Sequence, residues 1–435
     1  MTSFVLNNTR IIDPSRDIDE VGAIIVENGI ILAAGADALN AKFPTSALIH
    51  DCTGLVAVPG IIDARVTLTG SPDEYSKNIT TLSKEAVAGG ITSIILMPLG
   101  MSSFLDEYTF IKYALEEIRV KSLINVYPTA CLTSNMEGKE ISEMRLLQEQ
   151  GIVSFIQSPM SIHDTQVLLN SMKYAHMLNA IVALDTHDHF LGSRGVINEG
   201  IIANYLGLVG IPSISETVPL ARDLLIAQHT GGHYHASVIS IPQSIALIKH
   251  AKAHNTKATC GISINNLILN ENDVEMYNSL RKVLPPLRSE TERMSMVEAL
   301  EKGDIDIIVS DHTPRHMDTK LLPFAEASFG SIGLETMLSA ALRLFHGQQI
   351  SLKKLIRALS TRPAQIFNLP GGTLQTGTAA DIALIDLNYQ WTVKADDMSS
   401  IHKNTVFDKE FFYRKSRKNL YIRQASLYTR KLIHQ

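Results

Sequence analysis

Cysteine, net charge and long apolar runs are all scarce in this chain of 435 residues. Its three cysteines, Cys52, Cys131 and Cys260, are too few and too scattered for a disulfide framework or a thiolate zinc site, which fits a reducing cytoplasm. The formal net charge of −5 excludes a basic field of the kind that binds nucleic acid. The longest apolar runs, such as residues 91–98, are far shorter than the roughly 20 residues of a membrane helix. We expect a cytoplasmic protein without a secretory signal that binds neither nucleic acid nor membranes.

The composition is otherwise that of a packed globular protein. Hydrophobic residues make up 45% of the chain and charged residues 19%, which excludes disorder, collagen-like repeats and coiled coil as the main architecture. The chain is too long for one small core. Its length favours two or three domains, or one barrel with an appendage.

From residue 61 onward, apolar strand-like runs alternate with longer segments of helical periodicity, such as residues 107–122. The runs that have the length and composition of buried strands are residues 61–68, 91–98, 123–130, 151–158, 180–187, 233–240, 256–263 and 305–312. Eight β–α units in about 300 residues are typical of a parallel (β/α)₈ TIM barrel. We assign this barrel to residues 60–365, with a doubly wound parallel sheet as the alternative.

Both ends of the chain have short apolar runs separated by turn residues. Asn28-Gly29 lies between two such runs and predicts a tight hairpin, because both positions favour positive φ. The strand pattern returns after Pro370. The simplest arrangement combines residues 1–59 with residues 366–435 in one small β-sandwich beside the barrel.

Sequence motifs along nearly the whole chain point to one family. In chain order they are IIDP (11–14), GLVAVPGIID (54–63), AGGITSIILMP (88–98), VINEG (196–200), TGGHYH (230–235), LPPLRSETER (284–293), SDHTP (310–314), GSIGLET (330–336) and GTLQTGTAADIALID (372–386). With these motifs the chain resembles the amidohydrolase superfamily, and within it the dihydroorotases of the class that associates with aspartate carbamoyltransferase. Allantoinases and dihydropyrimidinases share the same skeleton. The resemblance implies an amidohydrolase-type TIM barrel, but function must be argued from the site.

The resemblance also implies a metal site, usually of zinc, at the carboxyl ends of the barrel strands. A His-x-His pair ends strand one, a bridging carboxylate lies on strand four, histidines end strands five and six, and an aspartate ends strand eight as the proton shuttle. The five positions before that aspartate hold other residues here, in strand order Arg65, Thr67, Gln157, Asp185 and Val238. Only the aspartate, Asp311, is retained. Valine and arginine supply no zinc ligand, so we expect no metal and a vestigial Asp311.

The positions that hold the substrate in the family differ as well. Thr69 stands where the resemblance implies an arginine that grips the substrate carboxylate. Leu99 and Leu284 replace two asparagines, and Arg315 replaces the histidine that follows SDHTP. A site built to hydrogen-bond a polar pyrimidine discriminates much less well when its polar groups become leucine.

These differences favour a degenerate dihydroorotase that has kept its barrel. The resemblance implies that such a chain assembles with aspartate carbamoyltransferase in pyrimidine biosynthesis, as a non-catalytic scaffold that itself forms a homo-oligomer. The alternative is an active dihydroorotase, interconverting dihydroorotate and N-carbamoyl-aspartate at an atypical or rebuilt site, with zinc if a metal is used. A third hypothesis is a new pocket in which Arg65 and Arg315 bind a small acid.

Several other residues invite a catalytic interpretation that we weigh against a structural one. His187 and His189, like His233 and His235, have a spacing that places both on one strand face, yet loop or supporting histidines are the more common outcome. We interpret Asp311 as a structural residue that was kept with the fold and that pairs with Arg65 across the barrel mouth. The basic tail, residues 414–435, is most simply a solvated edge of the sandwich, with docking to an acidic partner as the alternative.

Overall fold

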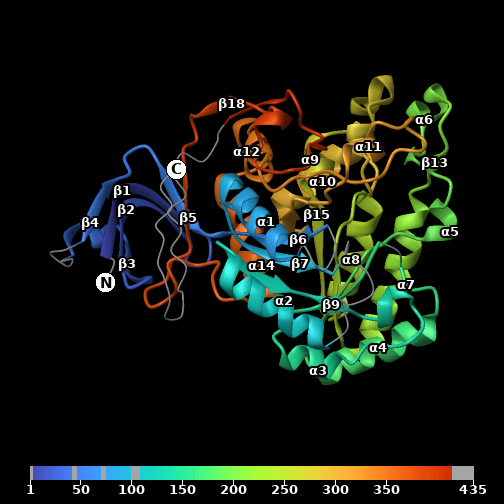
Figure 1. Ribbon diagram of the computed structural model, residues 1–435, viewed down its shortest axis with the longest axis horizontal. Helices are drawn as coiled ribbons and strands as arrows, with labels where there is room; N and C mark the ends of the chain where they lie inside the picture. The colour runs from blue at the N-terminus through green and yellow to red at the C-terminus, as the bar shows by residue number, and fades with distance from the viewer. Residues whose placement is uncertain (1–2, 42–46, 70–74, 99–107, 160, 414–435) are drawn as a thin grey trace.

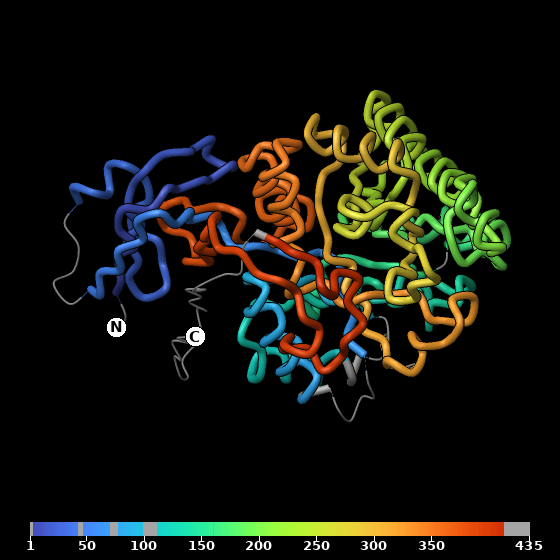
Figure 2. The backbone as a smooth tube through the Cα atoms, turned by 90° about the horizontal axis from the view of Figure 1, so that it is seen from above, coloured from blue at the N-terminus to red at the C-terminus, as the bar shows by residue number. Residues whose placement is uncertain are grey.

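The computed structural model describes residues 3–41, 47–69, 75–98, 108–159 and 161–413. A barrel of strands and helices contains most of the chain, and a smaller β domain lies beside it (Figure 1, Figure 2). In these segments no helix combines the length and the apolar character needed to cross a membrane.

Parallel strands form the barrel wall. Their bounds are β6 (Ile61–Thr67), β7 (Ile91–Met97), β8 (Asn125–Pro128), β9 (Ala130–Cys131), β10 (Phe155–Gln157), β11 (Ile181–Leu184), β14 (His233–Ala236), β15 (Ala258–Ser263) and β16 (Ile307–Val309). β8 and β9 are two parts of one strand, since β8 pairs with β7 and β9 pairs with β10. The circle closes where the backbone N–H of Thr67 donates to the carbonyl of His312, at 2.9 Å. The eight strands predicted from the sequence are therefore present within the described residues, and the predicted TIM barrel is confirmed.

Most residues of the barrel strands are buried because helices cover the outside and side chains fill the inside. All seven residues of β7 are buried, for example. The covering and connecting helices are α1 (Tyr75–Gly89), α2 (Tyr108–Lys121), α3 (Met144–Glu149), α4 (Thr165–Met177), α5 (His189–Gly192), α6 (Ile201–Leu206), α7 (Ile214–Thr230), α8 (Pro242–Ala253), α9 (Ile264–Ile268), α10 (Glu290–Lys302), α11 (Met317–Lys320), α12 (Met337–His346), α13 (Leu352–Ile356) and α14 (Arg362–Ile366). Two short strands, β12 (Ile197–Asn198) and β13 (Gly210–Ile211), pair outside the barrel wall.

The small β domain is built on one six-stranded sheet, in the order β17-β5-β1-β2-β3 with β4 against β1. The strands are β1 (Ser3–Asp13), β2 (Ile18–Glu27), β3 (Ile30–Gly35), β4 (Leu48–Asp51), β5 (Val56–Pro59) and β17 (Ile382–Ile385). Asn28 and Gly29 join β2 to β3 with φ of 53° and 80°, as predicted for the hairpin. β17 pairs antiparallel with β5, so the late part of the chain completes the sheet begun by the first part.

One C-terminal element departs from the expected sandwich. β18 (Gln390–Thr392) pairs with β19 (Phe411–Tyr413) instead of joining the sheet of β1. Trp391 Nε1 donates to Ser339 Oγ of α12, at 3.3 Å, and Phe412 is buried in the barrel's apolar core. This hairpin therefore packs on α12, although the assignment of residues 366–435 to the small domain placed it in the sandwich. The other limits of the two domains stay a prediction, and the basic tail 414–435 lies outside the described residues.

Candidate functional site at the barrel mouth

Polar side chains from four barrel strands converge where those strands end. Arg65 lies near the end of β6, Ser158 follows β10, Asp185 follows β11, and Asp311 follows β16. Because the strands are parallel, their carboxyl ends meet at one face of the barrel, and these side chains come together there. Asp311 adopts a positive φ of 55°, a conformation that costs energy for a residue with a Cβ and is concentrated at functional sites.

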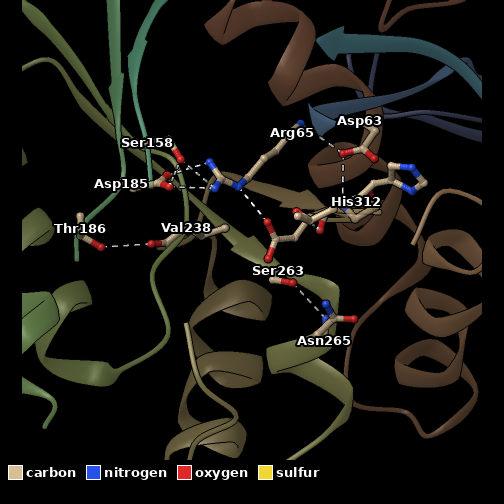
Figure 3. A network of polar contacts seen from close by, with 12 residues as sticks. Asp63, Arg65, Ser158, Asp185, Thr186, Val238, Ser263, Asn265 and His312 are labelled. Atoms are coloured by element: carbon tan, nitrogen blue, oxygen red, sulfur yellow. Dashed lines mark hydrogen bonds and ion pairs between the residues drawn. The ribbon is translucent and has the colours of Figure 1, made fainter. Parts of the chain in front are cut away.

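The guanidinium of Arg65 is at the centre of this cluster (Figure 3). Its Nη1 and Nη2 donate to the two carboxylate oxygens of Asp185, at 2.7 and 2.8 Å, and its Nε donates to Asp311 Oδ1 at 2.8 Å. Ser158 Oγ lies 3.3 Å from Nη2 and itself donates to Asp185 Oδ2. The predicted pair of Arg65 with Asp311 is thus present, and a planar two-bond fork to Asp185 is added to it.

The cluster is buried, and burial governs its electrostatics. Arg65, Asp185 and Asp311 are 8%, 5% and 7% exposed. Burial alone would lower the pKa of Arg65, but the charges of Asp185 and Asp311 together outweigh it and raise that pKa above its usual value. Burial raises the pKa of Asp311 to about 6, although the neighbouring Arg65 acts in the opposite direction. Arg65 therefore remains a fixed cation.

Asp63 supports this cluster from β6. Its Oδ1 accepts the backbone N–H groups of Ser310 and Arg65, at 3.1 and 3.3 Å, which ties the end of strand eight to strand one. Its Oδ2 is buried without a hydrogen-bond partner among the described residues. Burial raises the pKa of Asp63 to about 7.

At the other predicted ligand positions, the side chains do not direct metal-binding atoms toward a common centre. The side-chain amide of Gln157 is engaged in two other hydrogen bonds. Its Oε1 accepts from Thr133 Oγ1 at 2.8 Å, and its Nε2 donates to the carbonyl of Met136 at 2.7 Å. The Val238 side chain packs with Ile62 and other apolar residues, while its carbonyl accepts from Thr186. Thr67 is buried at the wall of the mouth.

A pocket of about 460 Å³ opens above the cluster and contains most of the predicted positions. Thr69, Leu284 and Arg315 all line it, together with Arg65, Asp185 and other mouth residues. Arg315 is exposed at the rim, where its Nε donates to the carbonyl of Phe329 at 2.9 Å, and burial of part of the side chain lowers its pKa. Leu99 lies outside the described residues.

Among the residues that the structure describes, the histidines do not build a replacement metal site. His187 lines the pocket, and burial lowers its pKa, whereas His189 begins the surface helix α5. His235 lies inside the barrel, with Nδ1 2.8 Å from Thr259 Oγ1, and burial lowers its pKa to about 3. His312 accepts the backbone N–H of Gly333 at 3.2 Å, with Nε2 3.7 Å from Glu85 of α1. Across the described ranges, no group of three or more His, Cys, Asp or Glu side chains is placed to hold a metal.

A second buried ion pair borders the pocket and was not predicted. Arg288 donates to Glu216 Oε2 at 3.2 Å, Ser240 Oγ at 2.9 Å and Asn198 Oδ1 at 2.8 Å. Both charged residues are 3% exposed. No local spacing signals this pair, because its members lie 72 positions apart.

The ion pair between Arg65 and Asp185 could have been predicted from the sequence. A basic residue stands at one predicted ligand position and an acidic residue at another, and opposite charges at one site tend to pair.

The donor set does not fit the zinc ion that the resemblance implies. Zinc binds about four N, O or S donors at close range, and of the five altered positions only Asp185 supplies an anionic ligand. Both of its oxygens accept hydrogen bonds from Arg65, whose positive charge lies between the two carboxylates. A cation in that position opposes the binding of a second one.

The mouth belongs to a protein with clear relatives. Residues 54–244 match the family model described as dihydro-orotase-like. The chain is similar to the dihydroorotase of Ehrlichia canis (strain Jake), with 36% identity over 92% of this chain and 89% of that one, and to the dihydroorotase of Geobacter metallireducens, with 35% identity over 93% and 95%. Among solved structures it resembles L-hydantoinase from Arthrobacter aurescens, with a TM-score of 0.83, 23% identity and coverage of 96% and 94%. This chain belongs to the dihydroorotase family.

Proposed function

We propose that this chain is a dihydroorotase-like protein of pyrimidine biosynthesis that does not hydrolyse dihydroorotate and acts as a structural partner of aspartate carbamoyltransferase. The proposal on activity and the proposal on the partner are tested separately below. We place this role in the cytoplasm.

The observation that carries the first proposal is the position of the Arg65 guanidinium between Asp185 and Asp311. Hydrolysis of a cyclic amide in this family requires a hydroxide near neutral pH and polarisation of the scissile carbonyl, and a bound metal supplies both. A guanidinium can neutralise charge, but it cannot ionise water. Arg65 also holds Asp311 Oδ1 in a hydrogen bond, which opposes its service as a proton shuttle.

The free-energy cost of breaking buried ion pairs favours keeping Arg65 between Asp185 and Asp311. Removing one member of a buried ion pair leaves an uncompensated charge and costs about 3–5 kcal/mol. Moving Arg65 aside would separate the guanidinium from Asp185 and Asp311 and leave these charges uncompensated until another cation took its place. Support for the partner comes from the family membership and from the motifs of the class that associates with aspartate carbamoyltransferase. The barrel supplies a rigid body for docking.

The experiment is hydrolysis of dihydroorotate by the purified protein, with and without added zinc, with the metal content counted on the same sample. We expect no turnover above an Asp311→Ala control and less than stoichiometric zinc. Turnover above that control would overturn the first proposal and support an active cyclic amide hydrolase with a rebuilt site. That alternative is favoured by one observation, the retention of Asp311 at the end of strand eight.

The partner is tested independently of turnover. Purified chain is mixed with the aspartate carbamoyltransferase catalytic chain of the same organism, and the mass of the mixture is measured by light scattering after size exclusion. A complex that co-elutes at a mass above either component supports the proposal. Separate elution at micromolar concentration of both proteins would overturn it.

A further inference from the structure

One wall of the mouth pocket is built around two buried lysines. Ser328, Phe329 and Gly330 line the pocket on this side. Lys320, the last residue of α11, is 0% exposed, and Lys282 is 2% exposed. Lysine is almost never fully buried unless its charge has a partner. The surroundings of the two ammonium groups therefore indicate what this wall is built to hold.

Backbone carbonyls surround the ammonium group of Lys320. Its Nζ donates to the carbonyls of Lys282, Ser328 and Gly330, at 3.1, 2.9 and 3.1 Å. An ammonium group has three N–H donors and no acceptor. Three carbonyls at these distances match it donor for donor and form a cage for a small cation.

Lys282 occupies a neighbouring position in the same wall. Its Nζ donates to the carbonyls of Phe324 and Ala325, at 2.8 and 3.0 Å. It also lies 4.7 Å from the ring centroid of Phe329 and 5.5 Å from that of Phe324, where the face of an aromatic ring attracts a cation. Both lysines thus contact the segment that forms this side of the pocket.

Carbonyls and aromatic rings, rather than carboxylates, compensate these two charges. Within the described ranges neither lysine forms an ion pair. Burial lowers the pKa of Lys282 to about 8, and burial with the nearby charges of Lys282 and Arg315 lowers that of Lys320 to about 7. A buried charge is costly even when it is hydrogen-bonded. An apolar side chain would avoid that cost, so the charge itself has a role in the wall.

Lys320 joins two parts of the pocket lining that are distant in sequence. Ser328 and Gly330 are lining residues, and Lys282 precedes the lining residue Leu284 by two positions. The backbone N–H of Gly330 also donates to the carbonyl of Lys282, at 3.1 Å. The ammonium group and this backbone bond together fix the spacing of the two segments.

The rim residue Arg315 depends on the same segment. Its Nε donates to the carbonyl of Phe329 at 2.9 Å, between the two caged carbonyls of Ser328 and Gly330. Its backbone N–H is held separately by Asn404 Oδ1, at 3.2 Å. Loss of the cage should therefore release the guanidinium of Arg315 while its backbone stays in place.

We propose that the carbonyls of Lys282, Ser328 and Gly330 form a binding site for an alkylammonium ion, which the chain fills with its own Lys320, and that this ion keeps the mouth pocket preformed before any ligand binds. Lys320 is a positioning residue, because it holds the lining and is not part of it. The site depends neither on hydrolysis of dihydroorotate nor on a partner, so its failure would leave both earlier proposals untouched.

The first test is amide hydrogen exchange of Lys320→Met, which keeps an apolar side chain and removes the charge and its donors. At pH 6, below the pKa of both lysines, we expect the amides of Ser328 and Gly330 to exchange about tenfold faster than in the wild type. The amide of Thr67, which closes the barrel, should be unchanged. The matched control is Lys249→Met, at a lysine whose side chain is 56% exposed. Unchanged exchange at Ser328 and Gly330 in Lys320→Met would overturn the proposal.

The second test refills the site from solution and does not require that the variant be fully stable. Lys320→Ala removes the side chain beyond Cβ, a fragment of the size of n-propylammonium. A ligand that binds only the folded state raises the melting temperature, so n-propylammonium chloride should stabilise Lys320→Ala and restore the protection of Ser328 and Gly330. Tetramethylammonium chloride has the same charge but no N–H donor and should do neither, and neither salt should affect Lys249→Met. Equal effects of the two salts on Lys320→Ala, or no effect of n-propylammonium, would show that the carbonyls do not recognise an ammonium ion.

Discussion

Arg65 and Asp185 form a two-bond fork across the barrel mouth, with N–O distances of 2.7 and 2.8 Å between strand one and strand five. The sequence resemblance predicts that both residues stand at metal-ligand positions of the family. The fork is a planar hydrogen-bonded ion pair that engages both carboxylate oxygens of Asp185, and the Nε–H of the same guanidinium donates to Asp311. These side-chain ion pairs add to the backbone hydrogen bond from Thr67 to His312 in closing the mouth.

Loss of the central cation should destabilise the fold strongly. Arg65→Met leaves two buried carboxylates without their partner, so we expect the free energy of unfolding to fall by about 3–5 kcal/mol. Urea denaturation followed by circular dichroism measures this. Arg145→Met is the control, because Arg145 is exposed and its pair with Glu149 is a surface pair, expected to contribute less than about 1 kcal/mol. Equal losses in the two variants would refute the central role of Arg65.

The stability of the protein should carry a pH dependence from Asp63. Its pKa is raised to about 7 by burial, from an ordinary value near 4, so the folded state binds the proton more tightly than the unfolded state. This contribution to stability is present below about pH 4 and is lost as the pH rises through about 7. Asp63→Asn removes it.

Urea denaturation at several pH values between 5 and 8 compares the two proteins. The difference in the free energy of unfolding between Asp63→Asn and the wild type should move in favour of the variant as the pH rises. Parallel pH profiles would show that Asp63 has an ordinary pKa in the folded protein.

Histidines introduced at the mouth should create a metal site. Arg65→His, Thr67→His and Val238→His together remove the fixed cation and place three imidazoles near Asp311, which matches the donor number that zinc prefers. We expect about one zinc per chain after dialysis, against much less for the wild type. The triple variant with alanine at the same positions separates donor chemistry from simple removal of Arg65, and equal zinc in the two triple variants would contradict the prediction.

The second buried pair should be a stabilising element of the pocket wall. Arg288→Met leaves Glu216 buried without its cation, with Ser240 and Ser244 as its remaining donors. We expect a loss of about 3–5 kcal/mol in the free energy of unfolding. The double variant with Glu216→Gln should recover part of that loss, because the uncompensated charge is then absent. A double variant less stable than Arg288→Met would count against this explanation.

The sequence was sufficient for the barrel because its strand and helix periodicities are local signals. The pair of Arg65 with Asp311 also followed from topology, since strands one and eight adjoin in a closed barrel. The fork to Asp185 and the pair of Arg288 with Glu216 depend on side-chain directions between residues 120 and 72 positions apart. No local pattern encodes those directions. The packing of the β18–β19 hairpin on α12 could not be predicted either, because a short strand pattern does not indicate which surface will bury it.

The pairing of β17 with β5 has a consequence for the synthesis of the chain. β5 lies second from the end of its sheet, and its outer edge is covered by β17. Translation delivers β5 before the barrel and β17 after it, so the N-terminal sheet leaves the ribosome with an open edge of unpaired N–H and C=O groups. Such an edge is a template for pairing with other chains, and only the near-complete polypeptide can close it. Truncated chains that end within the barrel should therefore aggregate through their N-terminal sheet.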